Sequence, residues 1–264
     1  MKDNHPDTFI KNMKCVIIFM FKGDGKMAGL SIEEMRDRLS INPMRYANMD
    51  NFMENYPPIA EFRAGESFAY VGISDRPWVY LFAEKEEEFS TLIHKTKSFS
   101  NFAVLTDEQL RWLDKIQTFQ TLISCGKYCL SKDKIVTGFD CSIEILNETD
   151  GDYIYAIYAY RGIVTKEYLL DLIYKKNMYG IKHNGVPFAM IGIQDDGAIG
   201  LLQVLPEYRR KGYATALVSE CVKMMRMKGK IPFAHIEKDH TASLALVAKM
   251  GFEFVENVHW VILN

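Results

Sequence analysis

The stretch Gly200–Ala214, GLLQVLPEYRRKGYA, decides the fold, because an apolar strand in it runs directly into a basic, glycine-containing helix start. Leu201, Leu202 and Val204 suit a buried strand, and Pro206 ends it because proline removes a backbone donor. The first backbone N–H groups of a helix lack intrahelical partners and carry the positive end of the helix dipole. The junction is therefore predicted to bind an anion such as a pyrophosphate.

The residues of the turn favour phosphate as that anion. Arg209, Arg210 and Lys211 are cations, and arginine can hold phosphate oxygens bidentately. Gly212 has no side chain, which lets a phosphate approach the backbone closely. Taken by itself, the turn also allows the alternative of a basic surface loop that binds nothing.

The run Arg209-x-x-Gly212-x-Ala214 resembles the signature Q/R-x-x-G-x-G/A of the GNAT superfamily of acyl-CoA N-acyltransferases. The resemblance implies that the cofactor is an acyl-CoA, with acetyl-CoA expected and no metal. In that family the strand before the turn and the helix after it both contact the cofactor. The resemblance therefore assigns cofactor binding to Leu202, Gln203, Val204, Arg209, Arg210, Lys211, Gly212, Tyr213, Ala214, Thr215 and Ser243.

A second run, Asp239–Phe252, resembles the family motif N-x-x-A/S-x-x-L-Y-x-K-x-G-F, whose helix flanks the pantetheine arm of coenzyme A. Ser243 matches this motif, but His240 stands where asparagine is usual and Val247 where many members have tyrosine. That tyrosine often protonates the departing thiolate. The usual general acid is therefore absent from its customary place.

The fold class predicted is α/β, mixed α+β, with the GNAT fold in residues 138–264: a central mixed, mostly antiparallel sheet flanked by helices. Hairpin turns at Asn184-Gly185 and Asp196-Gly197 and a long apolar periodicity after Gly212 support the element order β-αα-βββ-α-β-α-β. The predicted strands are Cys141–Leu146, Met178–Lys182, Pro187–Ile193, a strand ending at Val204, Pro232–Glu237 and Phe252–Leu263. Helices are expected at Tyr153–Tyr160, at Thr165–Tyr174, after Gly212 and before Gly251.

A polar, turn-prone stretch at Ser131–Gly138 predicts a boundary between an N-terminal α/β domain, 1–137, and the GNAT domain, 138–264. Capping boxes in the first part predict helices that begin at Ile32 and Asp107. Two strands, Ser67–Ile73 and Trp78–Ala83, form a predicted hairpin, followed by a helix at 86–97 and a strand at 101–105.

The role of the N-terminal half stays open. Longer family members that resemble glycine N-acyltransferase, and some two-domain bacterial members, carry a half that looks like a degenerate copy of the same fold. The first half here is interpreted as such a copy or, alternatively, as a dimerisation or substrate-docking module. Because Arg63–Glu66, RAGE, breaks the phosphate signature, a second cofactor site is not expected.

Transfer of an acyl group from a thioester to an amine needs a neutral nucleophile, donors for the developing oxyanion and protonation of the thiolate. Glu237 is the first candidate for the base, against the alternative of a solvated strand residue. His240 could act as the acid, since imidazole titrates near neutrality, or could only hydrogen-bond backbone. His235 is interpreted as a core histidine.

The composition excludes other classes of protein. A net charge of −2 shows no basic half, so nucleic acid is not an expected partner. The five cysteines are an odd number, which favours reduced thiols and a cytoplasmic location, and Cys125-x-x-x-Cys129 has no second ligand pair for a metal. Cys15–Phe21 is short for a membrane or signal segment and is interpreted as a buried strand.

The function predicted is direct transfer of an acyl, expected to be acetyl, group from acyl-CoA to a primary amine in a ternary complex. The acceptor is a small-molecule amine or a protein amino group, with no membrane partner and with a homodimer as an open possibility. The alternative is a non-catalytic acyl-CoA-binding regulatory or sensor protein, because the usual tyrosine and glutamate are both missing.

Overall fold

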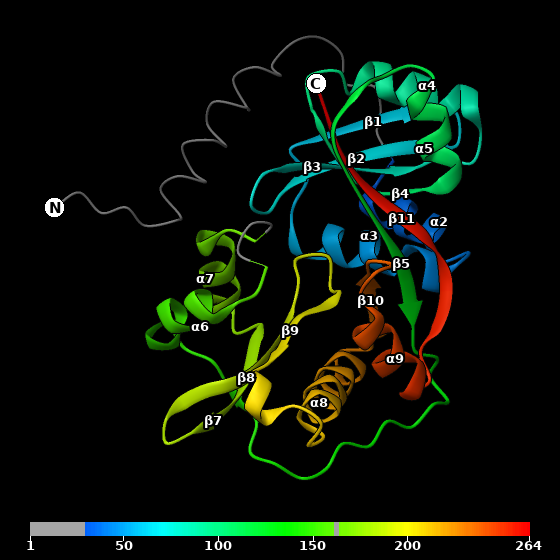
Figure 1. Ribbon diagram of the computed structural model, residues 1–264. Helices are drawn as coiled ribbons and strands as arrows, with labels where there is room; N and C mark the ends of the chain where they lie inside the picture. The colour runs from blue at the N-terminus through cyan, green and yellow to red at the C-terminus, as the bar shows by residue number, and fades with distance from the viewer. Residues whose placement is uncertain (1–29, 161–163) are drawn as a thin grey trace, which may run out of the picture.

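The computed structural model describes residues 30–160 and 164–264 (Figure 1). The N-terminal half consists of α2 (Ile32–Leu39), α3 (Pro43–Asn55), β1 (Ala60–Ala64), β2 (Ser67–Ile73), β3 (Pro77–Phe82), α4 (Glu86–Lys95), β4 (Asn101–Thr106), α5 (Asp107–Asp114) and β5 (Phe119–Cys129). The C-terminal half consists of β6 (Glu144–Ile145), η1 (Glu148–Asp150), α6 (Gly151–Ile157), α7 (Lys166–Tyr174), β7 (Met178–His183), β8 (Val186–Ile193), β9 (Ile199–Val204), η2 (Pro206–Tyr208), α8 (Tyr213–Met227), β10 (Phe233–Ile236), α9 (Thr241–Lys249) and β11 (Glu253–Leu263).

After β6, the order of helices and strands in the C-terminal half is the same as in the described N-terminal half. The series α2-α3-β1-β2-β3-α4-β4-α5-β5 is repeated as α6-α7-β7-β8-β9-α8-β10-α9-β11. The C-terminal series confirms the predicted order, although its first strand is shorter than the predicted 141–146. The N-terminal half therefore has the succession of elements expected of a copy of the fold.

Local signals start the helices and turns where they were predicted. Ser31 and Thr106 form capping boxes with Glu34 and Gln109, so α2 and α5 begin as expected. At the Asn184-Gly185 hairpin both residues have positive φ, 50° and 80°, as a two-residue turn of type I′ requires.

The strands form two sheets, one of seven strands in the order β1-β2-β3-β4-β11-β5-β10 and one of four in the order β6-β7-β8-β9. Among the described strand pairs, β3 with β4 is parallel and the others are antiparallel. β9 and β10 follow one another in the chain, on either side of α8, yet lie in different sheets (Figure 1).

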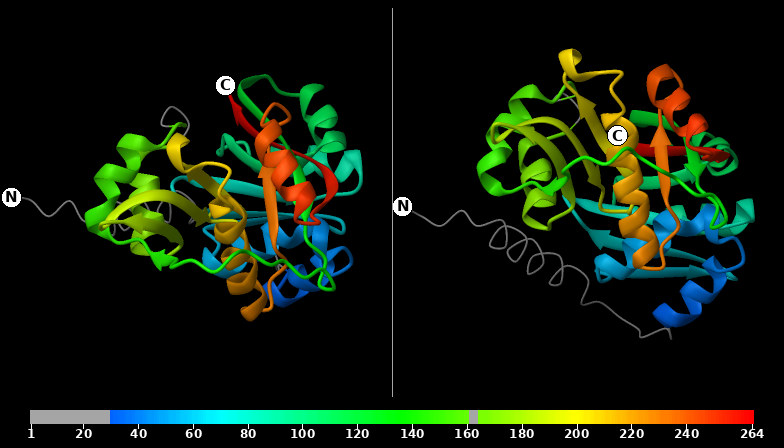
Figure 2. Two further views of the ribbon diagram at one scale, coloured as in Figure 1. Left: turned by 60° about the horizontal axis from the view of Figure 1, so that its bottom comes forward. Right: turned by 90° about the horizontal axis from the view of Figure 1, so that it is seen from below.

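Each half places its last strand in the sheet of the other half. β11, from the C-terminal half, lies between β4 and β5 of the N-terminal half, and β5 lies between β11 and β10 (Figure 1). The chain between β5 and β6 passes along α8, where a Cβ built on Gly138 would lie 2.7 Å from the Ala216 Cα (Figure 2). The two halves are thus joined by shared strands, and the boundary at 137/138 stays a prediction.

Helices cover opposite faces of the β7-β8-β9 part. Leu202 and Val204 pack with buried residues of α8 such as Leu217 and Val218. Leu201, beside them in the chain, packs with Ile154 of α6 and with residues of α7. This alternation puts α8 on one face of β9 and the α6–α7 pair on the other.

Three elements of the N-terminal half were not predicted. α3 has little amphipathic pattern, because it buries Asn48 and Asn51 together with apolar residues. β1 and β5 are partly exposed strands, so neither is a continuous buried apolar run. The predicted strand Cys15–Phe21 lies outside the described residues.

Among the residues of the two described ranges, no helix has both the length and the apolar composition to cross a bilayer.

Candidate functional site

The pairing of β9 with β8 is irregular near the end of β9. Opposite Ile191 of β8, two residues of β9, Leu201 and Leu202, stand against one, which is a β-bulge. Leu201 has φ 55°, an unfavourable conformation for a branched side chain, and the pairing with β8 resumes at Gln203. β9 and β10 are edge strands of different sheets, so the edge of each that faces away from its partner strand is unpaired among the described residues, and we call the space between these two edges the gap.

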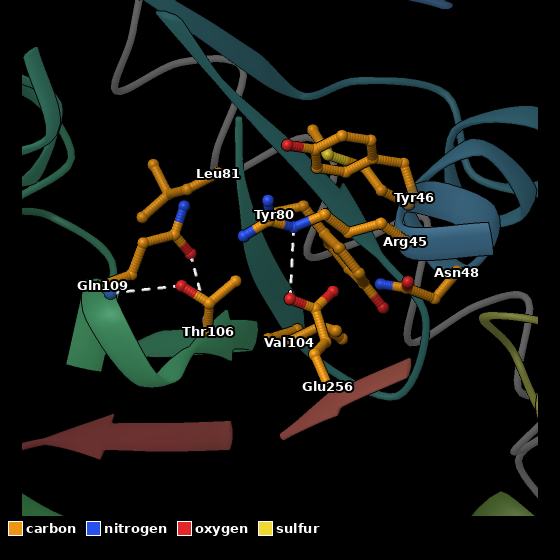
Figure 3. A pocket seen from close by; sticks show the side chains of 11 residues that line it. Arg45, Tyr46, Asn48, Tyr80, Leu81, Val104, Thr106, Gln109 and Glu256 are labelled. Atoms are coloured by element: carbon orange, nitrogen blue, oxygen red, sulfur yellow. Dashed lines mark hydrogen bonds and ion pairs between the residues drawn. The ribbon is translucent and has the colours of Figure 1, made fainter. Parts of the chain in front are cut away.

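The corresponding strands of the N-terminal half lack this gap. β3 pairs with β4 through Val79 with Phe102 and Tyr80 with Ala103. Beyond these pairs, Arg45 of α3 forms an ion pair with Glu256 of β11 at 3.1 Å, and aromatic and amide side chains fill the space (Figure 3). The remaining cavity of about 20 Å³ has room for about one water molecule.

The predicted phosphate turn is a strand-to-helix junction in the structure. After η2, Arg210 and Gly212 have φ of 58° and 88°, and α8 begins at Tyr213. The N–H of Ala216 donates to the Gly212 carbonyl at 3.0 Å, which starts the helical bonding and leaves the N–H groups before it without intrahelical acceptors. This is the arrangement that holds phosphate at a helix start.

Cationic side chains surround that junction. Arg209, Arg210 and Lys211 are exposed, and the Arg209 Nε donates to the Val204 carbonyl at 3.0 Å. The Lys211 Nζ lies 5.6 Å from the centre of the Tyr208 ring. The first-turn residues that were predicted to bind the cofactor, namely Tyr213, Ala214 and Thr215, are half-buried.

Gly212 makes a contact that the sequence does not reveal. A Cβ built on Gly212 would lie 2.8 Å from a ring carbon of Phe139, whose side chain is 45% exposed. The Phe139 ring also packs on Tyr213, with ring centres 5.3 Å apart. Glycine at position 212 therefore meets two requirements: it leaves space for the Phe139 ring, and it adopts the left-handed backbone conformation without strain.

We expect Gly212→Ala to weaken acetyl-CoA binding at least about tenfold, because the β-carbon strains the turn that presents the N–H groups. Isothermal calorimetry measures the change. The double variant Phe139→Ala/Gly212→Ala separates the loss of space for the Phe139 ring from the backbone strain, since it removes the ring contact and keeps the strained backbone. If the double variant binds as tightly as Phe139→Ala alone, Gly212 serves only to accommodate the ring.

The N-terminal half has a different charge at its equivalent turn. The strand-to-helix turn there is Ala83–Lys85, and α4 then opens with Glu86, Glu87 and Glu88. Carboxylates in a first helical turn repel phosphate. Arg63–Glu66 lies elsewhere, at the end of β1 and in the turn to β2, so its comparison with the phosphate signature was misplaced.

The side chain of Gln203 points away from α8. Its Oε1 accepts a hydrogen bond from the Ala159 N–H at 2.8 Å, and its Nε2 donates to the Ile157 carbonyl at 2.6 Å. These bonds fix the end of α6 on β9. Cofactor binding by Gln203 stays a prediction, and it rests on the backbone rather than on this amide.

Glu237 directly follows β10 and is half-buried. It shares a face of the strand with His235, two residues earlier. Burial and, after it, the charge of Glu237 raise the pKa of the Cys125 thiol on the neighbouring strand β5 to about 12. Glu237 therefore presents a carboxylate on the face of β10 opposite the buried Ala234 and Ile236.

His235 lies deeper on the same face. Its side chain is 6% exposed, its Nδ1 lies 3.6 Å from the Asp196 Oδ2, and its Nε2 has no hydrogen-bond partner among the described residues. Burial and the charge of Lys127 lower its pKa, so the ring is neutral, as expected of a core histidine. Burial and the adjacent Asp195 raise the pKa of Asp196.

His240 stands before the first residue of α9 and makes no side-chain capping bond. The hypothesis that it replaces asparagine as a backbone hydrogen-bonding residue is therefore wrong in this structure. Its ring packs instead against Tyr160, with ring centres 5.1 Å apart. Ser243 is half-buried in the first turn, and Val247 is buried in the core.

Sequence reasoning missed Tyr160, although it follows the first helix of the predicted αα pair. Its contact with His240 joins residues far apart in the chain, so no local pattern indicates it. No group of three or more His, Cys, Asp or Glu side chains that could hold a metal occurs in residues 30–160 and 164–264.

The comparisons with known proteins agree with this geometry. The family model described as FR47-like protein matches residues 179–261. A Drosophila protein of known structure is 16% identical, with a TM-score of 0.69 over 89% of this chain and 97% of its own. A GCN5-related N-acetyltransferase from Kribbella flavida is 11% identical, with a TM-score of 0.54 over 83% and 94%.

A third structure, a GCN5-related N-acetyltransferase from Sphaerobacter thermophilus, is 13% identical, with a TM-score of 0.52 over 75% of this chain and 76% of its own. No curated protein matches the chain by sequence. Identities this low establish a shared fold. The family model matched within the C-terminal half and the shared fold confirm the resemblance of that half to the GNAT superfamily.

Proposed function

We propose that the protein transfers an acetyl group from acetyl-CoA to a primary amine. The observation that carries the proposal is the pair of unpaired strand edges, on β9 and β10, together with the helix start that follows β9 at Gly212. In the described residues of the N-terminal half β3 pairs with β4 and the equivalent helix start is acidic, so we place the acyl-CoA site in the C-terminal half.

Residues on the α8 side of the gap would hold acetyl-CoA. The N–H groups at the start of α8 and the cations of Arg209–Lys211 fit a pyrophosphate, and the unpaired edge of β9 fits an amide-containing arm. Acetyl-CoA supplies the activated acyl group. The Val204 N–H polarises its carbonyl in this proposal, because the Leu205 N–H already donates to the Phe188 carbonyl at 2.9 Å, so this step needs no side chain.

Proton transfer falls to side chains on the opposite face. Glu237 is the base that removes the proton of the acceptor ammonium, directly or through water. The contact between Tyr160 and His240 places two titratable side chains beside the start of α9, where Val247 supplies no acid. His240 protonates the departing thiolate in this proposal.

Release of free thiol from acetyl-CoA, measured with a panel of primary amines, tests the function. An amine-dependent rate at least about tenfold above hydrolysis supports transfer. Tight acetyl-CoA binding with no amine-dependent thiol release would favour the alternative of a non-catalytic acyl-CoA sensor. That alternative is kept because the family tyrosine is absent and position 247 is buried in the core.

His240→Asn is expected to leave acetyl-CoA binding unchanged and to lower kcat about tenfold, because asparagine cannot supply a proton. Stopped-flow thiol detection and calorimetry measure the two effects. Full activity of the variant would mean that His240 only packs against Tyr160.

A further inference from the structure

The two substrates of a ternary complex must reach the gap from different sides. The helix start that fits phosphate belongs to α8, which covers the face of β9 carrying Leu202 and Val204. Gln203 points to the other face, where the end of α6 lies. An acceptor that approaches the same gap therefore passes the residues that follow α6.

Those residues span the gap from one strand to the other. The Gln203 amide holds Ile157 and Ala159 on β9 through hydrogen bonds of 2.6 and 2.8 Å. One residue later, the Tyr160 ring contacts His240, which lies just beyond β10. The segment 157–160 is thus anchored at both sides of the opening.

The segment 157–160 contains aromatic side chains and no charged side chain. Its sequence, Ile-Tyr-Ala-Tyr, contains no ionised side chain at neutral pH. Tyr158 is 5% exposed and forms an edge contact with Tyr160 at 5.8 Å between ring centres, so its buried ring packs against the Tyr160 ring. Tyr160 is 42% exposed and therefore has ring surface free for a ligand.

We propose that Tyr158, Tyr160 and His240 form the acceptor subsite, which takes the aromatic body of an arylalkylamine, and that Gln203 is its positioning residue. The inference rests on the proposed function, because it names the substrate class of the same site. An aryl group gains edge-to-face contacts with these rings that a short alkylamine cannot make.

The ratio of kcat/KM for phenethylamine to that for ethylamine tests the subsite. We expect a ratio of at least about ten in the wild type and in Tyr160→Phe, which keeps the ring, and a ratio near one in Tyr160→Ala. Tyr153→Ala is the matched control, since Tyr153 is also exposed on α6 but makes no ring contact among the described residues. A ratio near one in the wild type, or an equal loss in Tyr153→Ala, overturns the proposal.

Calorimetric binding of phenethylamine to the protein saturated with coenzyme A separates this inference from the function. If no amine is acetylated, the proposed function fails, yet binding that Tyr160→Ala weakens and Tyr153→Ala does not would still support the subsite. If amines are acetylated but phenethylamine binds the Tyr160→Ala variant as tightly as the wild type, the subsite fails and the function stands.

Gln203→Glu tests the positioning role. A carboxylate keeps the acceptor for the Ala159 N–H but places an oxygen against the Ile157 carbonyl, so the segment should shift. We expect the KM for phenethylamine to rise about tenfold relative to the KM for ethylamine. A fall in acetyl-CoA affinity with an unchanged phenethylamine KM would place Gln203 on the cofactor side instead.

Discussion

Residues 138–264 produced alone are expected to remain unfolded, whereas the full chain folds. β10 pairs with β5, and the pairing begins at Phe233 opposite Cys129 and ends at Ile236 opposite Gly126. β11 pairs with β4 and β5. The fragment lacks both partner strands. Phe233, Val258 and Val261, each at most 1% exposed, would lose much of their cover. At about 1.5–3 kcal/mol for each buried side chain, the loss approaches a typical total stability of about 5–15 kcal/mol.

Circular dichroism and the dispersion of amide proton resonances measure the result. Two controls distinguish missing strands from poor expression: co-production of residues 1–137 should restore the fold, and a full chain cut at a protease site inserted after Lys134 should stay folded. A cooperative thermal transition of the isolated fragment would instead show that the halves fold independently and that 137/138 is a true domain boundary.

Much of the C-terminal half could be predicted because its signals are local. The Asn184-Gly185 turn, the apolar run of β8 and the basic glycine turn at Gly212 each act within a few residues, and the structure has the corresponding elements. The bulge at Leu201 was not predicted. A positive φ at a leucine has no sequence signal, although this residue separates β9 from β10.

The exchange of β5 and β11 between halves could not be predicted for a related reason. The pairs of β11 with β5 join residues more than a hundred positions apart, and a half-exposed strand such as β5 looks the same whichever strand lies beside it. The Tyr160 contact with His240 and the Asp196 contact with His235 also depend on this long-range packing. The predicted site therefore contained residues that belong to local sequence motifs, and it lacked Tyr160 and Asp196, which reach the site through long-range packing.

Glu237→Gln is expected to lower kcat by about 10²-fold to 10³-fold, because general base catalysis contributes about 10²-fold to 10⁴-fold and a neutral amide cannot take a proton. The Kd for acetyl-CoA should not change, since the site proposed for acetyl-CoA lies at the end of β9 and the start of α8 and does not include Glu237. Glu253→Gln is the matched control, because its side chain is 73% exposed at the start of β11. Steady-state thiol release and calorimetry give the two parameters.

A change of nucleophile makes the test of Glu237 sharper. Hydroxylamine is largely neutral at neutral pH and does not need the base for its first deprotonation, so the defect of Glu237→Gln should shrink to a few-fold with this acceptor. An equal defect with hydroxylamine and with an alkylamine would mean that Glu237 orders the site rather than accepting a proton. If Glu237→Gln keeps full activity while His235→Gln loses it, the base is the buried pair of His235 with Asp196, whose imidazole is already neutral. That result would require the acceptor to reach the Nε2 of His235, an atom without a hydrogen-bond partner among the described residues.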